Sequence, residues 1–237
     1  MGEIFLETKS ITKKFGDVVA VNNVDFVVRL GEIQGLIGEN GSGKSTISSM
    51  ICGIHSITSG EIILKGKPYR PADPGDARSH GIGMIVQEAG TVDYLTVAEN
   101  IFLGEEKRFS KFGFLNKGAM EEEARKALEA IGVDIDVTRP AAAYNFETRK
   151  LVEIAKTLYY KPELLIVDET TTALSQDGRD KIHEIMRSLA AEGKAVLFIS
   201  HDLPELMEIC DNLTVLRDGR LIARINKSEL EGDFIKE

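Results

Sequence analysis

The residues best able to do chemistry lie in a glycine-rich segment, Gly38-Glu39-Asn40-Gly41-Ser42-Gly43-Lys44-Ser45, which fits the pattern G-x-x-x-x-G-K-[ST]. Glycines let backbone N–H groups curl around phosphate oxygens without clashes from Cβ atoms. A lysine here can bridge the β- and γ-phosphates of a nucleotide, and the serine hydroxyl can ligate Mg²⁺. The predicted nucleotide-binding residues are Gly38, Asn40, Gly41, Ser42, Gly43, Lys44, Ser45 and Thr46.

A pair of carboxylates follows a second apolar run. Residues 164–167 are continuously apolar, as in a strand buried on both faces, and Asp168 and Glu169 come directly after them. In a parallel sheet the carboxyl ends of the strands line the ligand crevice. Asp168 could hold the Mg²⁺ shell, and Glu169 could polarise the water that attacks a γ-phosphate. A strand running into an acidic turn is the alternative, but the phosphate loop earlier in the chain favours catalysis.

Two more polar residues follow predicted strands. Gln87 closes residues 82–86, and His201 closes residues 195–200. An amide at Gln87 could sense Mg²⁺ and the attacking water, and His201 could hydrogen-bond the γ-phosphate. Taken alone, each is better explained as a polar residue marking a strand end. Three strands ending in polar groups beside a phosphate loop favour the catalytic role.

Strands and helices that must position these groups alternate at both ends of the chain. Residues 33–37 predict the strand leading into the phosphate loop, and a helix is expected from Thr46 to about Cys52. Two β-branched runs, 18–21 and 24–28, predict strands separated by a turn at Asn22-Asn23. Asp218-Gly219 between two apolar runs predicts a hairpin.

The middle of the chain is mostly helical in pattern, from residue 91 to about 160. Apolar residues at helical spacing are Met120, Ala124, Ala127, Leu128 and Ile131. The pattern indicates an α/β core interrupted by a helical lobe. We expect a single domain over residues 1–237, with the core in 1–88 and 161–237 and the helical subdomain in 89–160.

Composition excludes several classes of protein. The 237 residues include 38 acidic and 29 basic side chains, a net charge of −9, which argues against general nucleic-acid binding. No run of 18 or more apolar residues exists, so we expect no membrane-spanning helix. The first residues show no secretory signal pattern, and the two cysteines, Cys52 and Cys210, indicate a reducing compartment.

The order and spacing of these motifs resemble those of the ATP-binding cassette (ABC) ATPases. The motifs are the phosphate loop, Gln87, the Asp168-Glu169 pair and His201. The resemblance implies an α/β P-loop NTPase (RecA-like) core with an N-terminal antiparallel β subdomain and an inserted helical subdomain. It also implies ATP and Mg²⁺ as cofactors. The implied roles are metal ligation by Ser45, Gln87 and Asp168 and catalysis by Glu169, His201 and Gln87.

An aromatic residue near the N-terminus also matches the family. Phe15, directly before Gly16, corresponds to the aromatic side chain that stacks on adenine. The alternative is that Phe15 packs at a turn.

Three segments point to one subfamily of the ABC ATPases. They resemble the first ATPase half of ribose- and galactose-type monosaccharide importers, and they cover residues 81–88, 98–104 and 152–156. This implies a subunit that hydrolyses ATP to power import of a small solute. The implied partners are transmembrane permease subunits, a second ATPase cassette and, indirectly, a solute-binding protein, with no nucleic acid. The implied location is cytoplasmic, peripheral on the inner face of the cell membrane.

The chain departs from the family at its signature loop. The usual Leu-Ser-Gly-Gly-Gln is replaced by Tyr144-Asn145-Phe146-Glu147-Thr148, and Ser175 replaces an aspartate that communicates across the dimer. In the family, this loop reaches the γ-phosphate held by the opposite subunit. Glu147 would add a carboxylate there, and two like charges within about 4 Å cost roughly 1–4 kcal/mol. Two functions therefore stay open: an ATPase, or an ATP-binding regulatory cassette with little turnover.

Overall fold

The structure is a computed structural model that describes residues 2–88, 90–111 and 114–226. Its strands are β1 (Ile4–Phe15), β2 (Val18–Arg29), β3 (Ile33–Ile37), β4 (Ser59–Leu64), β5 (Lys67–Tyr69), β6 (Ile82–Ile85), β7 (Ser110–Lys111), β8 (Phe114–Leu115), β9 (Leu164–Asp168), β10 (Ala195–Ile199), β11 (Asn212–Arg217) and β12 (Arg220–Asn226). Its α-helices are α1 (Lys44–Ile51), α2 (Pro74–Ser79), α3 (Val97–Ile101), α4 (Lys117–Glu129), α5 (Phe146–Tyr159), α6 (Gln176–Ala191) and α7 (Leu203–Ile209). In these described ranges, no helix is long and apolar enough to cross a membrane.

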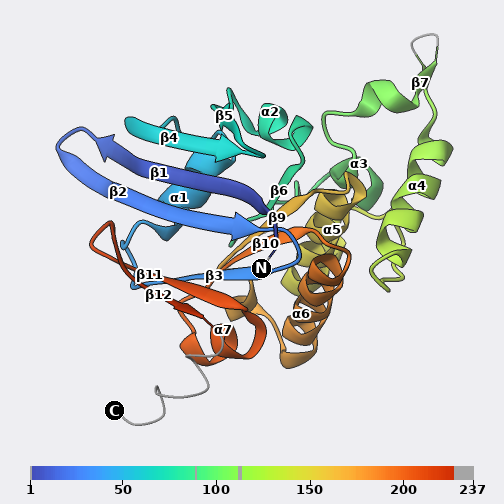
Figure 1. Cartoon of the computed structure of the whole chain (residues 1–237). Coiled ribbons are helices and arrows are strands. Elements are labelled where there is room, and N and C mark those ends of the chain that lie inside the picture. Colours follow the sequence, from blue (N-terminus) through green and yellow to red (C-terminus); the bar gives the residue numbers. More distant parts are fainter. Residues whose placement is uncertain (1, 89, 112–113, 227–237) are drawn as a thin grey trace.

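A six-stranded sheet forms the centre of the molecule, with the strand order β12-β11-β3-β10-β9-β6 (Figure 1). Strand β10 runs parallel to both β3 and β9, and β6 runs parallel to β9. Because these strands share one direction, the segments that follow β3, β6, β9 and β10 emerge at the same edge. The predicted α/β core is therefore present, and its strand ends are brought together.

The two faces of this sheet bury different partners. Along β10, Phe198 joins a core cluster that contains residues of α3 to α7, whereas its neighbour Leu197 joins a cluster shared with β1, β2 and α1. Successive side chains of a strand point to opposite faces, so an uninterrupted apolar run fills both clusters. Both residues are fully buried. The sheet thus sits between the antiparallel strands and the helices and fixes the loops at its edge.

The antiparallel sheet, ordered β2-β1-β4-β5, contains the one predicted turn that is wrong. Strand β2 continues through Asn22-Asn23, which form a β-bulge: Ile11 pairs with Val24, but Lys13 pairs with Val21. Asn23 adopts a φ of 51°, and its backbone N–H donates to the hydroxyl of Thr12 over 3.1 Å. Asparagine tolerates this left-handed conformation, so a pair typical of turns produces a bulge.

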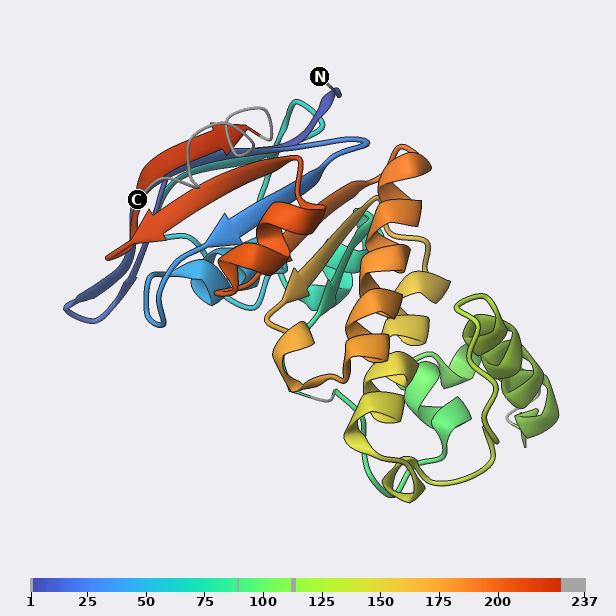
Figure 2. The ribbon, with the colours of Figure 1, turned by 90° about the horizontal axis from the view of Figure 1, so that it is seen from below.

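Helices α3 and α4 pack on α5 and form a helical group away from the antiparallel sheet (Figures 1 and 2). The apolar face predicted for α4 is buried, with Met120, Ala124 and Leu128 at most 1% exposed. We propose residues 89–160 as the limits of this helical subdomain and 1–237 as the domain. Residues 1, 89 and 227–237 of these boundaries lie outside the described residues.

Candidate functional site

The glycine-rich loop connects β3 to α1. Helix α1 begins at Lys44, two residues before the predicted start, because its N-cap Gly43 adopts a left-handed φ of 100° and the helical turn follows at once. A Cβ at Gly43 would lie 2.6 Å from the carbonyl oxygen of Ala20, so only glycine fits there. Asn40 and Gly41 are exposed at the tip of the loop, and Thr46 is half-buried in the first helical turn.

Lys44 is buried at the centre of the site, with 4% of its surface exposed. Its Nζ donates to the carbonyl oxygen of Gly38 over 2.7 Å and to that of Glu39 over 3.1 Å. The same atom lies 3.2 Å from the Glu169 Oε1. The lysine of the loop and the carboxylate at the end of β9, far apart in sequence, are therefore in direct contact.

Asp168 lies beside the first turn of α1. Its Oδ2 accepts a hydrogen bond from the Ser48 hydroxyl over 2.9 Å, and its Oδ1 accepts one from the Ser45 hydroxyl over 3.4 Å. Burial raises the pKa of this carboxyl, an effect that the two serine hydrogen bonds oppose. Sequence reasoning missed Ser48, although its place three residues after Ser45 puts both hydroxyls on one helix face.

Glu169 is held in a left-handed backbone conformation, with a φ of 44°. Its N–H donates to the Ile199 carbonyl over 2.9 Å, which ties the end of β9 to the end of β10. The Nδ1 atom of His201 lies 3.8 Å from the Glu169 Oε2, whereas Lys44 contacts the other oxygen, Oε1. Such strained residues are frequent at functional sites. Glu169 therefore lies between the loop lysine and the exposed imidazole.

Gln87 and Phe15 lie outside this cluster of contacts. Gln87 follows β6 at the same sheet edge, and its side chain is exposed. Phe15, which ends β1, is 43% exposed and meets the ring of His55 edge to face, with 5.1 Å between ring centroids. Lys13 lies above the Phe15 ring, with its Nζ 4.9 Å from the centroid. An exposed ring of this kind offers a face to a base.

The residues present fit a magnesium-bound nucleotide. The Ser42 hydroxyl is buried in the loop without a hydrogen-bond partner, as expected of a donor that waits for a phosphate oxygen. Ser45 and Asp168 place two hard oxygen ligands side by side. Within the described residues, no group of three or more His, Cys, Asp or Glu side chains could hold a metal ion. Mg²⁺ held by one carboxylate and a hydroxyl would complete its shell with water and phosphate oxygens.

A buried carboxylate links the loops that carry Glu169 and His201. Glu205 of α7 accepts hydrogen bonds from Thr171 over 2.9 Å, from Ser200 over 3.0 Å and from the His183 ring over 3.0 Å. Burial alone would raise the pKa of Glu205, but these hydrogen bonds and the His183 charge outweigh it and hold the pKa below its ordinary value. His183 is buried within this network.

The loop of residues 144–148 forms the start of α5. Asn145 is the N-cap, and its side chain accepts from the Thr148 N–H over 2.8 Å. Glu147 turns toward the start of α6, where it contacts Ser175. The carboxylate is therefore bound within the chain.

Comparison with known families matches residues 21–172 to the ABC transporter family. This chain belongs to that family. Its fold agrees: the crystal structure of the ADP conformation of MJ1267, an ATP-binding cassette of an ABC transporter, matches with a TM-score of 0.84 at 27% identity. The match covers 99% of this chain and 96% of that one. The resemblance and the fold class predicted from the sequence are both confirmed.

Relatives of this ABC cassette include proteins named for sugar import. The ribose import ATP-binding protein RbsA 1 of Rubrobacter xylanophilus is 44% identical over 98% of this chain and 46% of its own length. A putative ribose/galactose/methyl galactoside import ATP-binding protein of Agrobacterium fabrum is 38% identical over 98% of this chain and 45% of its own length. The cassette thus spans about half the length of the curated relatives it matches.

Proposed function

We propose that this chain is an ATPase cassette that hydrolyses ATP to power import of a small solute through a membrane ABC transporter. The observation that carries the proposal is the meeting of two side chains behind the phosphate loop: Glu169 lies 3.2 Å from Lys44. Asp168, one residue earlier, binds the hydroxyls of Ser45 and Ser48. A triphosphate in the loop would therefore face a base and a metal-binding carboxylate at once.

The reaction follows from these positions. The loop amides and Lys44 bind the β- and γ-phosphates. Glu169 accepts a proton from water while the water oxygen bonds to the γ-phosphorus and the bond from that phosphorus to the bridging oxygen of ADP breaks. His201 donates a hydrogen bond to the departing phosphate. Bound Mg²⁺ would neutralise charge on the phosphates, and Ser45, Asp168 and Gln87 are the residues that we propose to hold it.

The solute and the partners are inferred from the relatives. Their names favour a monosaccharide of the ribose or galactose kind. Because those relatives are about twice as long, we propose that this chain works with a second ATPase cassette. Permease subunits and, indirectly, a solute-binding protein complete the assembly, which places the chain on the cytoplasmic face of the cell membrane. No nucleic acid takes part.

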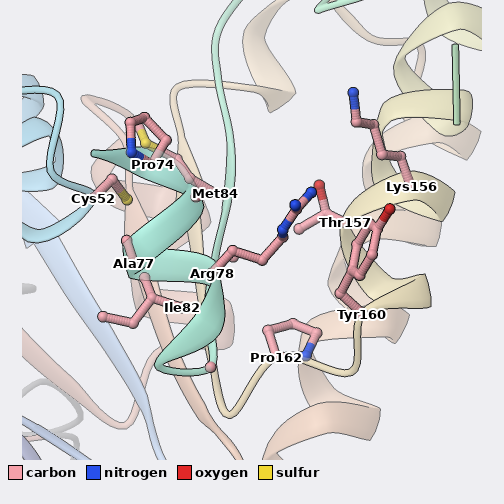
Figure 3. A pocket seen from close by; sticks show the side chains of 13 residues that line it. Cys52, Pro74, Ala77, Arg78, Ile82, Met84, Lys156, Thr157, Tyr160 and Pro162 are labelled. Carbon is pink, nitrogen blue, oxygen red and sulfur yellow. The ribbon is translucent and has the colours of Figure 1, made fainter. Parts of the chain in front are cut away.

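A pocket between the core and the helical subdomain is our candidate for the permease contact. Its 390 Å³ cavity lies between α2, β6 and the end of α5 (Figure 3). Arg78 reaches across it and stacks on the Tyr160 ring, with 4.5 Å from Cζ to the ring centroid. Burial and the Arg78 charge lower the pKa of Lys156 on the same rim. Arg78 is already paired with Glu105, so the apolar walls and the Lys156 ammonium suit a short helix that carries an acidic side chain.

The experiment that tests the function uses the chain assembled with its permease and second cassette. Glu169→Gln should abolish ATP hydrolysis and solute uptake while ATP binding survives, because the loop that binds phosphate is unchanged. Lys44→Ala should weaken ATP binding itself. Wild-type protein that hydrolyses ATP no faster than Glu169→Gln, with its partners present, would overturn the proposal.

That same outcome would support the second candidate function, an ATP-binding regulatory cassette with little turnover. The observation that favours this alternative is Glu147, an acidic residue in the loop of residues 144–148 that, by resemblance to the family, should face a phosphate of the opposite cassette.

A further inference from the structure

Helix α5 carries a buried ion pair outside the contacts described so far. Lys150 Nζ lies 2.8 Å from Glu153 Oε2, and the two side chains are 0% and 8% exposed. The three-residue spacing puts both on one face of the helix. Sequence reasoning missed the pair because its partners are distant in the chain.

Both side chains bind the backbone on either side of Gln87. Lys150 Nζ donates to the carbonyl oxygens of Val86 and Glu88, each over 2.6 Å. Glu153 accepts from the N–H of Val86 and from the N–H of Gly90, each over 3.1 Å. The loop uses carbonyl oxygens as acceptors for Lys150 and N–H groups as donors to Glu153. Because donors and acceptors must both match, the loop can bind α5 in one register only.

The energetics of such a pair point to positioning. A buried ion pair adds little net stability, because the desolvation of both charges offsets their attraction. The two charges compensate each other, and the loop that carries Gln87 supplies further hydrogen bonds to both side chains. Displacement of the loop from α5 would leave these buried donors and acceptors without their backbone partners, which is unfavourable.

We propose that Lys150 and Glu153 are positioning residues that fix the Gln87 loop to α5. The position of Gln87 is then set by α5 and not by the central sheet. The inference rests on the proposed function, since it concerns the residue proposed to sense Mg²⁺ and the attacking water. Lys150 also touches the start of α5: its Nζ lies 5.7 Å from the centroid of the Phe146 ring, within the loop of residues 144–148. A shift of that loop would thereby be passed to Gln87.

The test compares Lys150→Met and Glu153→Gln with Lys181→Met in the assembled transporter. Lys150→Met keeps most of the length of the side chain and removes its charge. Glu153→Gln leaves an oxygen for only one of the two N–H groups. Lys181 pairs with Glu184 at the same three-residue spacing over 3.2 Å, but on the surface of α6, so Lys181→Met is the matched control.

We expect Lys150→Met and Glu153→Gln each to lower kcat about tenfold, because the rate falls steeply when a catalytic group is displaced. Each should also raise the Mg²⁺ concentration for half-maximal turnover several-fold. The KM for ATP should stay within about twofold, because the phosphate loop is untouched. Hydrogen exchange of the peptide around residues 86–90 should accelerate, while that of the phosphate loop should not. Lys181→Met should match the wild type in all four measurements.

Two results would overturn the inference. One is that Lys150→Met and Glu153→Gln both keep the wild-type kcat and the wild-type Mg²⁺ concentration for half-maximal turnover. The other is a loss of kcat that matches the loss of folded protein with an unchanged Mg²⁺ midpoint, as a purely structural role predicts. Glu169→Gln in the same assembly separates this failure from that of the proposed function: if Glu169→Gln turns over like the wild type, the function is wrong, and exchange at residues 86–90 still tests the attachment.

Discussion

The carboxylate of Glu147 accepts a hydrogen bond from the Ser175 hydroxyl over 2.9 Å, so two positions at which the chain departs from its family's pattern are in contact. Glu147 Oε2 also lies 3.4 Å from the Ser175 N. A Cβ at Gly178 would come within 2.7 Å of the same carboxylate, so glycine leaves it room. Glu147 therefore sits at the N-terminal end of α6, where the helix dipole favours a negative charge.

Removal of this charge should strengthen pairing of two copies of the chain. In a Glu169→Gln background with ATP and Mg²⁺, we expect Glu147→Gln to tighten the dimer Kd about tenfold, since like charges near 4 Å cost roughly 1–4 kcal/mol. Sedimentation velocity measures the effect. Ser175→Ala, which keeps the charge, should remain monomeric or weakly paired. A tight dimer with Glu147 intact would contradict the prediction.

Asp168→Asn should stabilise the nucleotide-free protein at pH 7. Burial raises the pKa of Asp168, which means that its ionised form is disfavoured in the folded state. A neutral amide avoids that cost, so thermal unfolding should occur at a higher temperature. Addition of Mg²⁺ and ATP should then stabilise the variant less than the wild type. An unfolding temperature at or below that of the wild type without nucleotide would refute the expectation.

Glu205 should make stability depend on pH on the acid side. Its pKa is held below the ordinary value of 4.5, so its contribution is complete above pH 4.5 and is lost as the pH falls through the lowered value. We expect Glu205→Gln to cost about 1–3 kcal/mol at pH 7, as for a buried group that loses hydrogen bonds, and the difference should shrink in acid.

Urea unfolding at a series of pH values checks this prediction. Glu208→Gln is its control, because Glu208 lies on the same helix in an exposed pair with Arg187. A difference between Glu205→Gln and the wild type that is constant down to the lowest pH would show that the charge of Glu205 does not contribute.

Phe15→Ala should weaken ATP binding. If the exposed ring stacks on adenine, its removal costs about 1–3 kcal/mol, or roughly 5- to 150-fold in affinity. Titration with a fluorescent ATP analogue measures the change, and Phe15→Tyr should bind nearly as well as the wild type. Equal affinity in Phe15→Ala would assign the ring to packing against His55.

Local patterns predicted the part of the site that depends on neighbours in sequence. The glycine spacing at residues 38–45 predicts phosphate binding, and the carboxylates after residues 164–167 predict metal binding and catalysis. Each prediction needs only a few consecutive residues. Parallel strands then carry these separate groups to one sheet edge, so Lys44 and Glu169 meet. The bulge at Asn23 was not predictable, since an asparagine pair suits a turn equally well.

The supporting contacts could not be predicted, because they join residues without a shared period. Glu153 is 67 residues from Val86, and Glu205 is 34 residues from Thr171. In the sequence, each is a charged residue within a helix, which usually means a solvated face. Only the packing of α5 on the Gln87 loop and of α7 on the loop after β9 makes them buried acceptors.

The contact between Lys44 and Glu169 has a consequence for when the proposed reaction can start. The lysine ammonium engages one of the two carboxylate oxygens of Glu169. The incoming triphosphate competes for the same ammonium, so its arrival would release the base. The substrate would therefore free an oxygen of its own proposed base as it binds.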